Sequence, residues 1–411
     1  MHSWPLYDMY SELSKKSRIS QLIVEHQNYR NSTLNMIPSE NLLSPAVAAA
    51  ISSDLEARYT LPYSEILHGE KVENGYRGTR FMDEVELETK KNIEKLFKVP
   101  YSSVKPLSGH LAAMITMGAL LKPGDKVSVI PVEGGGYDGY LPHLLPTLLQ
   151  LTAVFLPFDY SRWDLDYELL PDHLKKEKPK AIILGTSFPL FPFDIKRVRE
   201  EINDNLDQDT LLLLDASHFL GLIAGKAYPD PIVDGADIYY GSTHKTFPGP
   251  QRGIILTHRE DLIEKVNTDF FWRWQDNCHW GSIAALGIAA EELLKWGEKY
   301  ANLIVTLSQN LAKRLSEKGL PIRCPERGFT QTHQLHVLTE NLLKKWNFGV
   351  VKMAGMLEES GIIVDNIGRL GTQELARAGV KKSDIDKISD WFIKAIIINI
   401  IQNRCIYYFL K

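Results

Sequence analysis

The fold class is decided by the stretch LLLLDASHFLGLIAGKAYPDPIVDGADIYYGSTHKTFPGPQRGIIL, residues 211–256. Three short apolar runs, at 210–215, 237–243 and 252–257, lie within this stretch or overlap its ends. Runs without polar alternation are typical of strands that are covered on both faces of a parallel sheet. Asp215 ends the first run, and Lys245 follows the second. Because open parallel sheets bind ligands at the carboxyl edge of their strands, we expect both side chains at one site.

The rest of the chain extends this pattern. Further apolar runs at 126–132, 153–158 and 180–186 alternate with helical patterns at 83–97, 110–121 and 194–204, which predicts a doubly wound, mostly parallel α/β sheet. From Gly281 a helical pattern continues beyond the length of one ordinary helix, as in a connector between domains. The runs at 334–338, 347–359 and 383–401 predict a small C-terminal α/β domain. We therefore predict an N-terminal arm (1–45), a large domain (46–299) and a small domain (300–411).

Composition excludes several classes of protein. The 411 residues are 44% hydrophobic and 24% charged, as in ordinary globular proteins. The net charge of −4, without a basic run, argues against a nucleic-acid partner and favours a small-molecule substrate. The chain has three widely spaced cysteines without a CxxC pair, Cys278, Cys324 and Cys405. We therefore expect no metal site and no disulfide framework, and a reducing, cytoplasmic location. No run reaches the ~18 apolar residues of a membrane span, so we expect the apolar tail at 395–411 to be a buried terminal helix or a packing surface.

Four features that lie in chain order indicate one chemistry. Ser108, Gly109 and His110 precede a predicted helix, whose N-terminus can bind an anion or can simply be capped. Tyr137 follows a glycine turn, where it can stack on a ligand or belong to the core. Asp215 can be a structural carboxylate, and Lys245 a solvated loop residue or phosphate contact. Together they match what pyridoxal phosphate (PLP) needs: a phosphate site, a ring stacker, a partner for the pyridine nitrogen and an amine.

Five segments resemble the motifs of the serine hydroxymethyltransferase family, whose members are fold-type-I PLP enzymes. The similarity runs from about Met36 to Gly379. Its segments are NMIPSENLLSPAV (35–47), NGYRGTRF (74–81), PLSGHLAAM (106–114), the stretch 211–256 and GRLGTQELARAG (368–379).

This resemblance implies a role for each matching residue. Lys245 would hold PLP covalently, Asp215 would pair with the pyridinium nitrogen, and His218 would lie against the ring. The other cofactor contacts would be Ser108, Gly109, His110, Tyr137, Ser187, Thr243 and His244, while Ser39, Tyr59 and Arg369 would bind the substrate. The arginine fork suits a substrate carboxylate. Tyr59 and His218 are also expected to be catalytic, and the family's shared sites imply a homodimer.

Several departures fall on residues that matter for hydroxymethyl transfer. Tyr137 stands where the family stacks a histidine, Asn74 where it has its acid/base glutamate, and Met82 where it has a tyrosine. An insertion near 61–73 supplies three candidate replacements for the glutamate, Glu65, Glu70 and Glu73, of which we place Glu73 among the catalytic residues. The family's QGG loop reads FWRWQDNCHWGS (271–282), so Trp272, Trp274 and Trp280 form either a packing cluster or an aromatic substrate pocket.

The predicted function is aldol or retro-aldol chemistry at Cα of glycine- or serine-type amino acids. The main hypothesis is serine–glycine hydroxymethyl transfer with tetrahydrofolate as co-substrate. The alternative is a folate-independent aldolase or transaldolase that uses glycine, serine or threonine with another aldehyde acceptor. A non-catalytic role is disfavoured, because Asp215 and Lys245 would then have no reason to occur together with Arg369.

Overall fold

The computed structural model describes residues 17–67, 70–206, 209–268 and 270–409, with side chains omitted for 62–73 and 400–409. A seven-stranded sheet forms its centre, in the order β4-β12-β11-β10-β9-β5-β6. Neighbours from β11 to β6 are parallel, and β12 is antiparallel to both β11 and β4. The mostly parallel sheet is confirmed. Its strands are β4 (Tyr101–Ser103), β5 (Lys126–Val129), β6 (Thr152–Phe155), β9 (Ala181–Gly185), β10 (Leu211–Asp215), β11 (Ile238–Ser242) and β12 (Gly253–Thr257).

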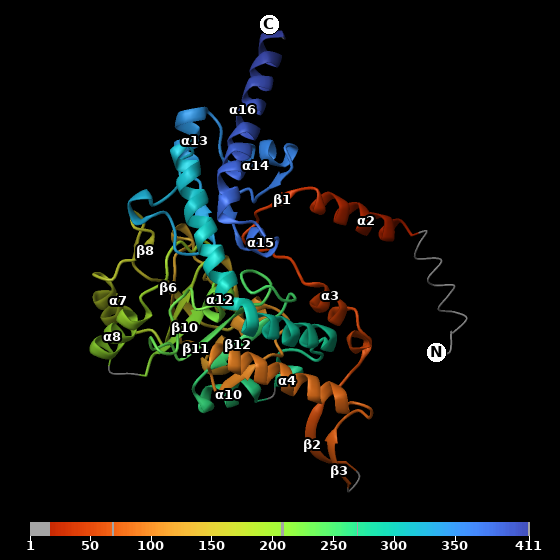
Figure 1. Cartoon of the computed structure of the whole chain (residues 1–411). Helices are drawn as coiled ribbons and strands as arrows, with labels where there is room; N and C mark the ends of the chain where they lie inside the picture. Colours follow the sequence, from red (N-terminus) through yellow and green to blue (C-terminus); the bar gives the residue numbers. More distant parts are fainter. Residues whose placement is uncertain (1–16, 68–69, 207–208, 269, 410–411) are drawn as a thin grey trace.

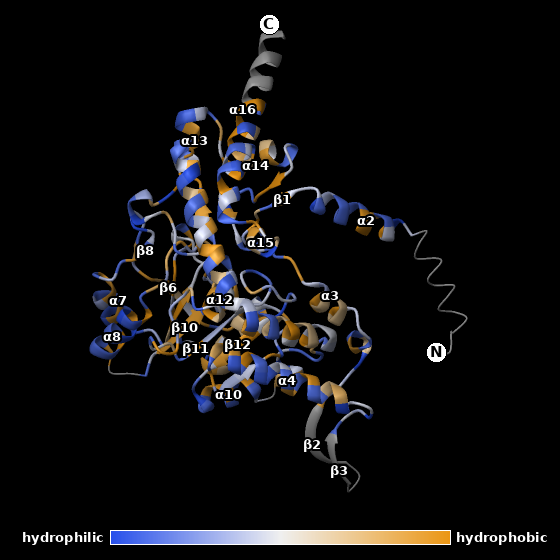
Figure 2. Cartoon of the chain, viewed as in Figure 1, coloured by the Kyte–Doolittle hydropathy of each residue, from blue (hydrophilic) through white to orange (hydrophobic). Residues whose placement is uncertain are grey.

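Helices cover this sheet because its central strands are apolar on both faces. Every residue of β9, β10, β11 and β12 is buried, and Figure 2 shows the strands as a hydrophobic centre. Helix α5 packs on β11 and β12, while α4 and α9 pack on α12, and α7 pairs with α8. These helices are α4 (Arg80–Phe97), α5 (Gly109–Leu120), α7 (Leu170–Glu177), α8 (Ile195–Asn205), α9 (Leu220–Ala224) and α10 (Glu260–Asn267).

The predicted connector is one helix, α12 (Trp280–Glu317), which runs from the sheet to the C-terminal elements (Figure 1). It crosses the predicted boundary at 299/300, so no loop separates the two regions. The C-terminal region has β13 (Gln334–His336) antiparallel to β15 (Arg369–Gly371), and its strand β14 (Ile362–Ile363) pairs with β1 (Leu34–Asn35). Its helices are α13 (Thr339–Trp346), α14 (Val350–Glu359), α15 (Gln373–Arg377) and α16 (Ile385–Phe409).

Two segments extend from this body in Figure 1. Helix α2 (Arg18–Asn31) has no buried residue and precedes α3 (Pro45–Ile51). The predicted insertion forms a hairpin of β2 (Pro62–Leu67) and β3 (Glu70–Asn74). The apolar tail up to Phe409 belongs to α16, whose residues Ile385, Ile388, Phe392 and Ile396 are buried, while residues 410–411 and the side chains of 400–409 lie outside the described residues. Among the described residues, no helix is long and apolar enough to cross a membrane, and no group of metal-ligating side chains is found.

Candidate active site

Asp215 is fixed at the carboxyl end of β10 by two donors. Its Oδ2 accepts a hydrogen bond from the Tyr140 hydroxyl at 2.7 Å, and its Oδ1 accepts from the Ser217 backbone N–H at 3.0 Å. The Tyr140 hydroxyl also lies 2.8 Å from that of Tyr240. Because a buried carboxylate needs such donors, this network holds Asp215 in one orientation. Tyr140, Tyr240 and Ser217 were not predicted as site residues.

Lys245 shares a cavity of about 220 Å³ with Asp215. Burial lowers the pKa of its amine from 10.5 to about 8; the charge of Asp215 opposes this shift, and that of Arg369 adds to it. A larger fraction of the amine is therefore neutral, and so nucleophilic, near neutral pH. The cavity is lined by Ser108, Gly109, His110, Tyr137, Thr186, Ser187, Asp215, Ser217, His218, Ser242, His244 and Lys245.

The start of α5 gives this cavity an anion-binding end. The Ser108 hydroxyl accepts from the Leu111 N–H at 3.1 Å, so it caps the helix, as the sequence suggested. The first N–H groups of α5, those of Gly109 and His110, have no partner within the helix. A Cβ on Gly109 would lie 2.8 Å from the Cβ of Ser242, so only glycine allows this close packing. These groups fit a phosphate.

Tyr137 lines the same cavity through contacts with two other residues. Its hydroxyl lies 2.9 Å from Nδ1 of His110, and its ring is perpendicular to that of Tyr140, at 5.3 Å between centroids. Burial, followed by the charges of Asp215 and Asp138, raises its pKa. Tyr137 is therefore a neutral aromatic wall of the cavity.

His218 stacks on a second buried histidine that the sequence analysis missed. The rings of His218 and His333 are 5.3 Å apart and nearly parallel, and Nδ1 of His218 lies 3.2 Å from Nε2 of His333. Gln334 approaches His218 Nδ1 at 3.1 Å and bonds to His336 at 3.1 Å. Burial lowers the pKa of His218, and that of His333 to about 3, so both imidazoles are neutral. The signal was the motif THQLH, in which His333 and Gln334 border a predicted strand.

Arg369, at the start of β15, contacts the backbone of Ser187, which lines the cavity of Lys245. Its Nη1 donates to the Ser187 carbonyl at 2.7 Å, and its Nε donates to Asp365 Oδ2 at 2.7 Å. Its guanidinium carbon lies 4.8 Å from the centroid of the Phe188 ring. These contacts set the direction of the fork and leave Nη2 for a ligand carboxylate.

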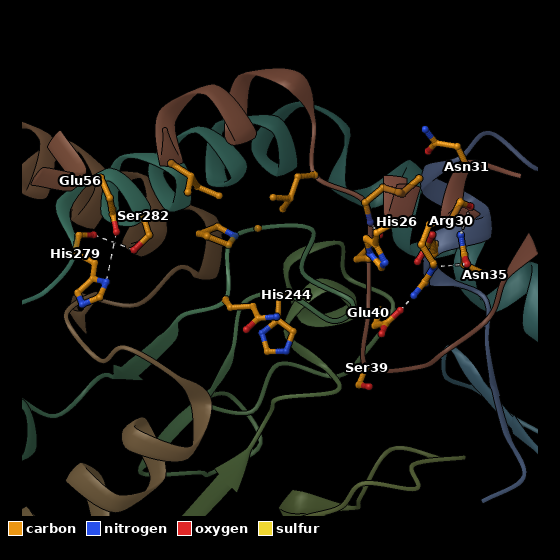
Figure 3. Close-up of a pocket in the computed structure, with 18 residues that line it drawn as sticks. His26, Arg30, Asn31, Asn35, Ser39, Glu40, Glu56, His244, His279 and Ser282 are labelled. Atoms are coloured by element: carbon orange, nitrogen blue, oxygen red, sulfur yellow. Dashed lines mark hydrogen bonds and ion pairs between the residues drawn. The ribbon is translucent and has the colours of Figure 1, made fainter. Parts of the chain in front are cut away.

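Figure 3 shows the residues that line a second cavity, of about 610 Å³. His244 lines both this cavity and that of Lys245. Ser39 also lines the second cavity, and the Arg30–Glu40 ion pair forms one side. Nδ1 of His244 is buried without a hydrogen-bond partner in the described chain, and burial lowers its pKa to about 4. Ser39 is thus brought beside a predicted cofactor residue.

Three predicted site residues, Arg369, Thr243 and Tyr59, line neither of these two cavities. Thr243 is fully buried, lines neither cavity, and donates its hydroxyl to the Pro250 carbonyl at 2.7 Å. Tyr59 is 45% exposed, lines neither cavity, and packs against Tyr76. The side chain of Glu73 lies outside the described residues, as do those of Glu65 and Glu70.

The departures from the family motifs have structural roles. Asn74 donates to the Thr60 hydroxyl at 2.7 Å and accepts from the N–H groups of Leu61 and Tyr76, so it closes the turn after β3. Met82 is a buried core residue of α4.

The three tryptophans do not form one cluster. Trp280 is buried, Trp274 packs on Gly118 of α5, and Trp272 is 71% exposed.

A buried amine that shares one cavity with a fixed carboxylate and a helix N-terminus is the arrangement of fold-type-I PLP enzymes. Comparison with known proteins places this chain among them. It belongs to the serine hydroxymethyltransferase family, because the family model of that description matches residues 13–392. The predicted family, the fold class and the assignment as a PLP-dependent transferase are therefore confirmed.

Similar proteins agree over nearly the whole chain. The serine hydroxymethyltransferase of Methanosphaera stadtmanae is 36% identical, covering 95% of this chain and 92% of its own. That of Methanobrevibacter smithii is 34% identical, with the same coverage. The crystal structure of L-threonine transaldolase from Pseudomonas fluorescens superposes with a TM-score of 0.83 and 26% identity, covering 95% of this chain and 89% of that one.

Proposed function

We propose that this protein transfers a one-carbon hydroxymethyl unit between serine and glycine, with tetrahydrofolate as co-substrate. The observation that carries the proposal is Lys245, which has a pKa of about 8 and shares one cavity with Asp215 and the start of α5. When bound, PLP supplies an electron sink for the bond broken at Cα. The chain would hold it through Lys245, Asp215 and the N–H groups of Gly109 and His110.

The remaining predicted residues orient the ligands in this proposal. Arg369 directs Nη2 toward the substrate carboxylate, since Asp365 and the Ser187 carbonyl already occupy two of its N–H groups. His218 stays neutral because burial lowers its pKa, so it packs against the cofactor ring without adding a charge. Tyr137 covers the ring from the other wall of the cavity.

We further propose that the active site is completed by a second copy of the chain in a cytoplasmic homodimer. Tyr59 lies outside both cavities of its own chain, and α2 exposes Ile19, Leu22, Ile23 and Val24. In a dimer, Tyr59 of one chain would reach the 610 Å³ cavity of the other. Mixing the inactive variants Y59F and K245A tests this: activity should reappear in the mixture. If the mixture remains inactive although subunit exchange has been verified, the active site is not shared between two chains.

The alternative is folate-independent transaldol transfer between threonine or serine and another aldehyde. Two observations favour it: the likeness to the L-threonine transaldolase structure, and the structural use of Asn74 and Met82 at two distinctive positions. It uses the same cofactor and amino-acid contacts as the main proposal.

One experiment separates the two reactions. Purified holoenzyme is given serine with or without tetrahydrofolate, and threonine with an aromatic aldehyde; products are measured by chromatography. Serine cleavage that requires folate supports the main proposal, and exchange of the aldehyde without folate supports the alternative. If neither reaction exceeds that of K245A, while the exposed-lysine control K226A behaves as wild type, the proposed function is wrong.

A further inference from the structure

A third cavity, of about 380 Å³, lies between the large domain and the C-terminal region. We call it the interdomain cavity. Trp163 and Phe188 of the large domain form one side, and the other includes Arg323, His336, Thr339 and Glu340. It shares no lining residue with the cavity of Lys245. Cavities of this size at domain boundaries are common ligand sites.

The main observation is the guanidinium group of Arg323. Its carbon lies 3.9 Å from the centroid of the Trp163 ring, and its Nε is enclosed. Within the described part of the chain this group donates no hydrogen bond and forms no ion pair; the carboxylate of Glu340, which lines the same cavity, acts on it only through its charge. A half-buried cation without an acceptor is costly, and native structures pair most such groups.

A neighbouring arginine, Arg327, differs from Arg323 in that its N–H groups are bonded within the protein. Arg327 also stacks on an aromatic ring, at 3.7 Å from Phe191. In contrast to Arg323, it donates to the Arg162 carbonyl at 2.6 Å and pairs with Asp164 at 3.3 Å. Arg327 therefore fastens the segment that carries Trp163, whereas the N–H groups of Arg323 are left for an anion.

His336 supplies the complementary group. The side-chain Nε2 of Gln334 donates to the Ser187 carbonyl at 3.3 Å, which places Oε1 of Gln334 opposite His336 Nε2, at 3.1 Å. Nε2 of His336 is therefore the protonated nitrogen, and Nδ1 carries a lone pair. Nδ1 is buried and has no partner in the described chain. It can accept a hydrogen bond from a hydroxyl group.

We propose that the interdomain cavity binds a small 2-hydroxy acid, whose carboxylate accepts from Arg323 and whose hydroxyl donates to His336. A neutral hydroxyl suits this position better than an ammonium group, because Arg323 and Arg369 both place positive charge near His336. This second site does not depend on the proposed reaction. It is connected to the active site, since Gln334 contacts both His336 and His218, and Phe188 lies under Arg369.

Isothermal titration of the holoenzyme tests the site. The probes are L-lactate and L-malate, which have no amine to react with the cofactor, and propionate, which lacks the hydroxyl. At least one hydroxy acid should bind once per chain, with propionate at least tenfold weaker. R323Q should raise the Kd of that acid at least tenfold. R197Q is the matched control, because Arg197 also stacks on an aromatic ring, that of Tyr167, but pairs with Glu168, and it should leave the Kd unchanged.

A second variant guards against misfolding of R323Q. T339W puts an indole into the cavity from the first residue of α13 and should abolish binding while the visible absorbance of the cofactor is kept. The proposal is overturned if neither hydroxy acid binds, if propionate binds equally well, or if R323Q and T339W leave the Kd as in R197Q.

Discussion

The depressed pKa of Lys245 leads to a quantitative prediction about cofactor capture. A shift from 10.5 to about 8 corresponds to roughly 3 kcal/mol of preference for the neutral amine. At pH 7 about 10% of the amine is then neutral, compared with about 0.03% for an unperturbed lysine. Because only the neutral amine attacks the cofactor aldehyde, the capture rate should rise with pH and reach half its maximum near pH 8.

The assay mixes cofactor-free protein with PLP between pH 6 and 10 and follows visible absorbance. R369Q removes a charge that lowers the pKa of Lys245, so the midpoint should move to higher pH. R327Q, which removes an arginine that does not act on Lys245, should leave it in place. A wild-type midpoint near 10, or a shift to lower pH in R369Q, would refute the assigned cause.

Three further predictions concern the phosphate end, the loop before α12 and acid stability. G109A should weaken PLP binding at least tenfold by absorbance titration, because its Cβ would lie 2.8 Å from Ser242, whereas G355A, with open space around it, should not. Arg252 donates to the carbonyls of residues 104, 105 and 278. R252M should therefore reduce the free energy of unfolding by about 3 kcal/mol or more, which calorimetry would detect as a lower melting temperature. In the folded protein the pKa of His333 is about 3, so its imidazole is neutral, whereas in the unfolded chain it takes up a proton below about pH 6.5. Acid therefore favours the unfolded state, and the melting temperature should fall between pH 7 and pH 5. H333N should make this fall smaller.

The sheet and its ligand edge were predictable because their signals are local. The continuous apolar run 211–214 requires a strand covered on both faces, and its polar end then places Asp215 at the sheet edge. The same logic placed Lys245 and the helix start at Gly109. Family motifs added Arg369 and Ser187, which are 182 residues apart in sequence and 2.7 Å apart in the structure.

The missed residues depend on tertiary contacts that leave no local pattern. Tyr140 reaches Asp215 across 75 residues, and Gln334 reaches His218 across 116. A tyrosine in a loop or a glutamine in a strand carries no sign of such a partner. For the tryptophans near 272–280 a local pattern was misleading. Their closeness in sequence suggested one cluster, but the backbone turns at Trp272, with φ of 63°, and the three side chains lie apart.

The continuous helix α12 makes the two regions of this protein mechanically dependent on each other. At about 1.5 Å per residue its 38 residues extend for about 57 Å. It packs on α3, α4 and α9 of the sheet region and also on β13, α15 and α16 of the C-terminal region. A continuous helix that is packed along its length leaves no flexible linker that would let the C-terminal region move freely. A displacement of the loop that ends at His279 would therefore be passed along α12 to β13, which pairs with the strand that carries Arg369.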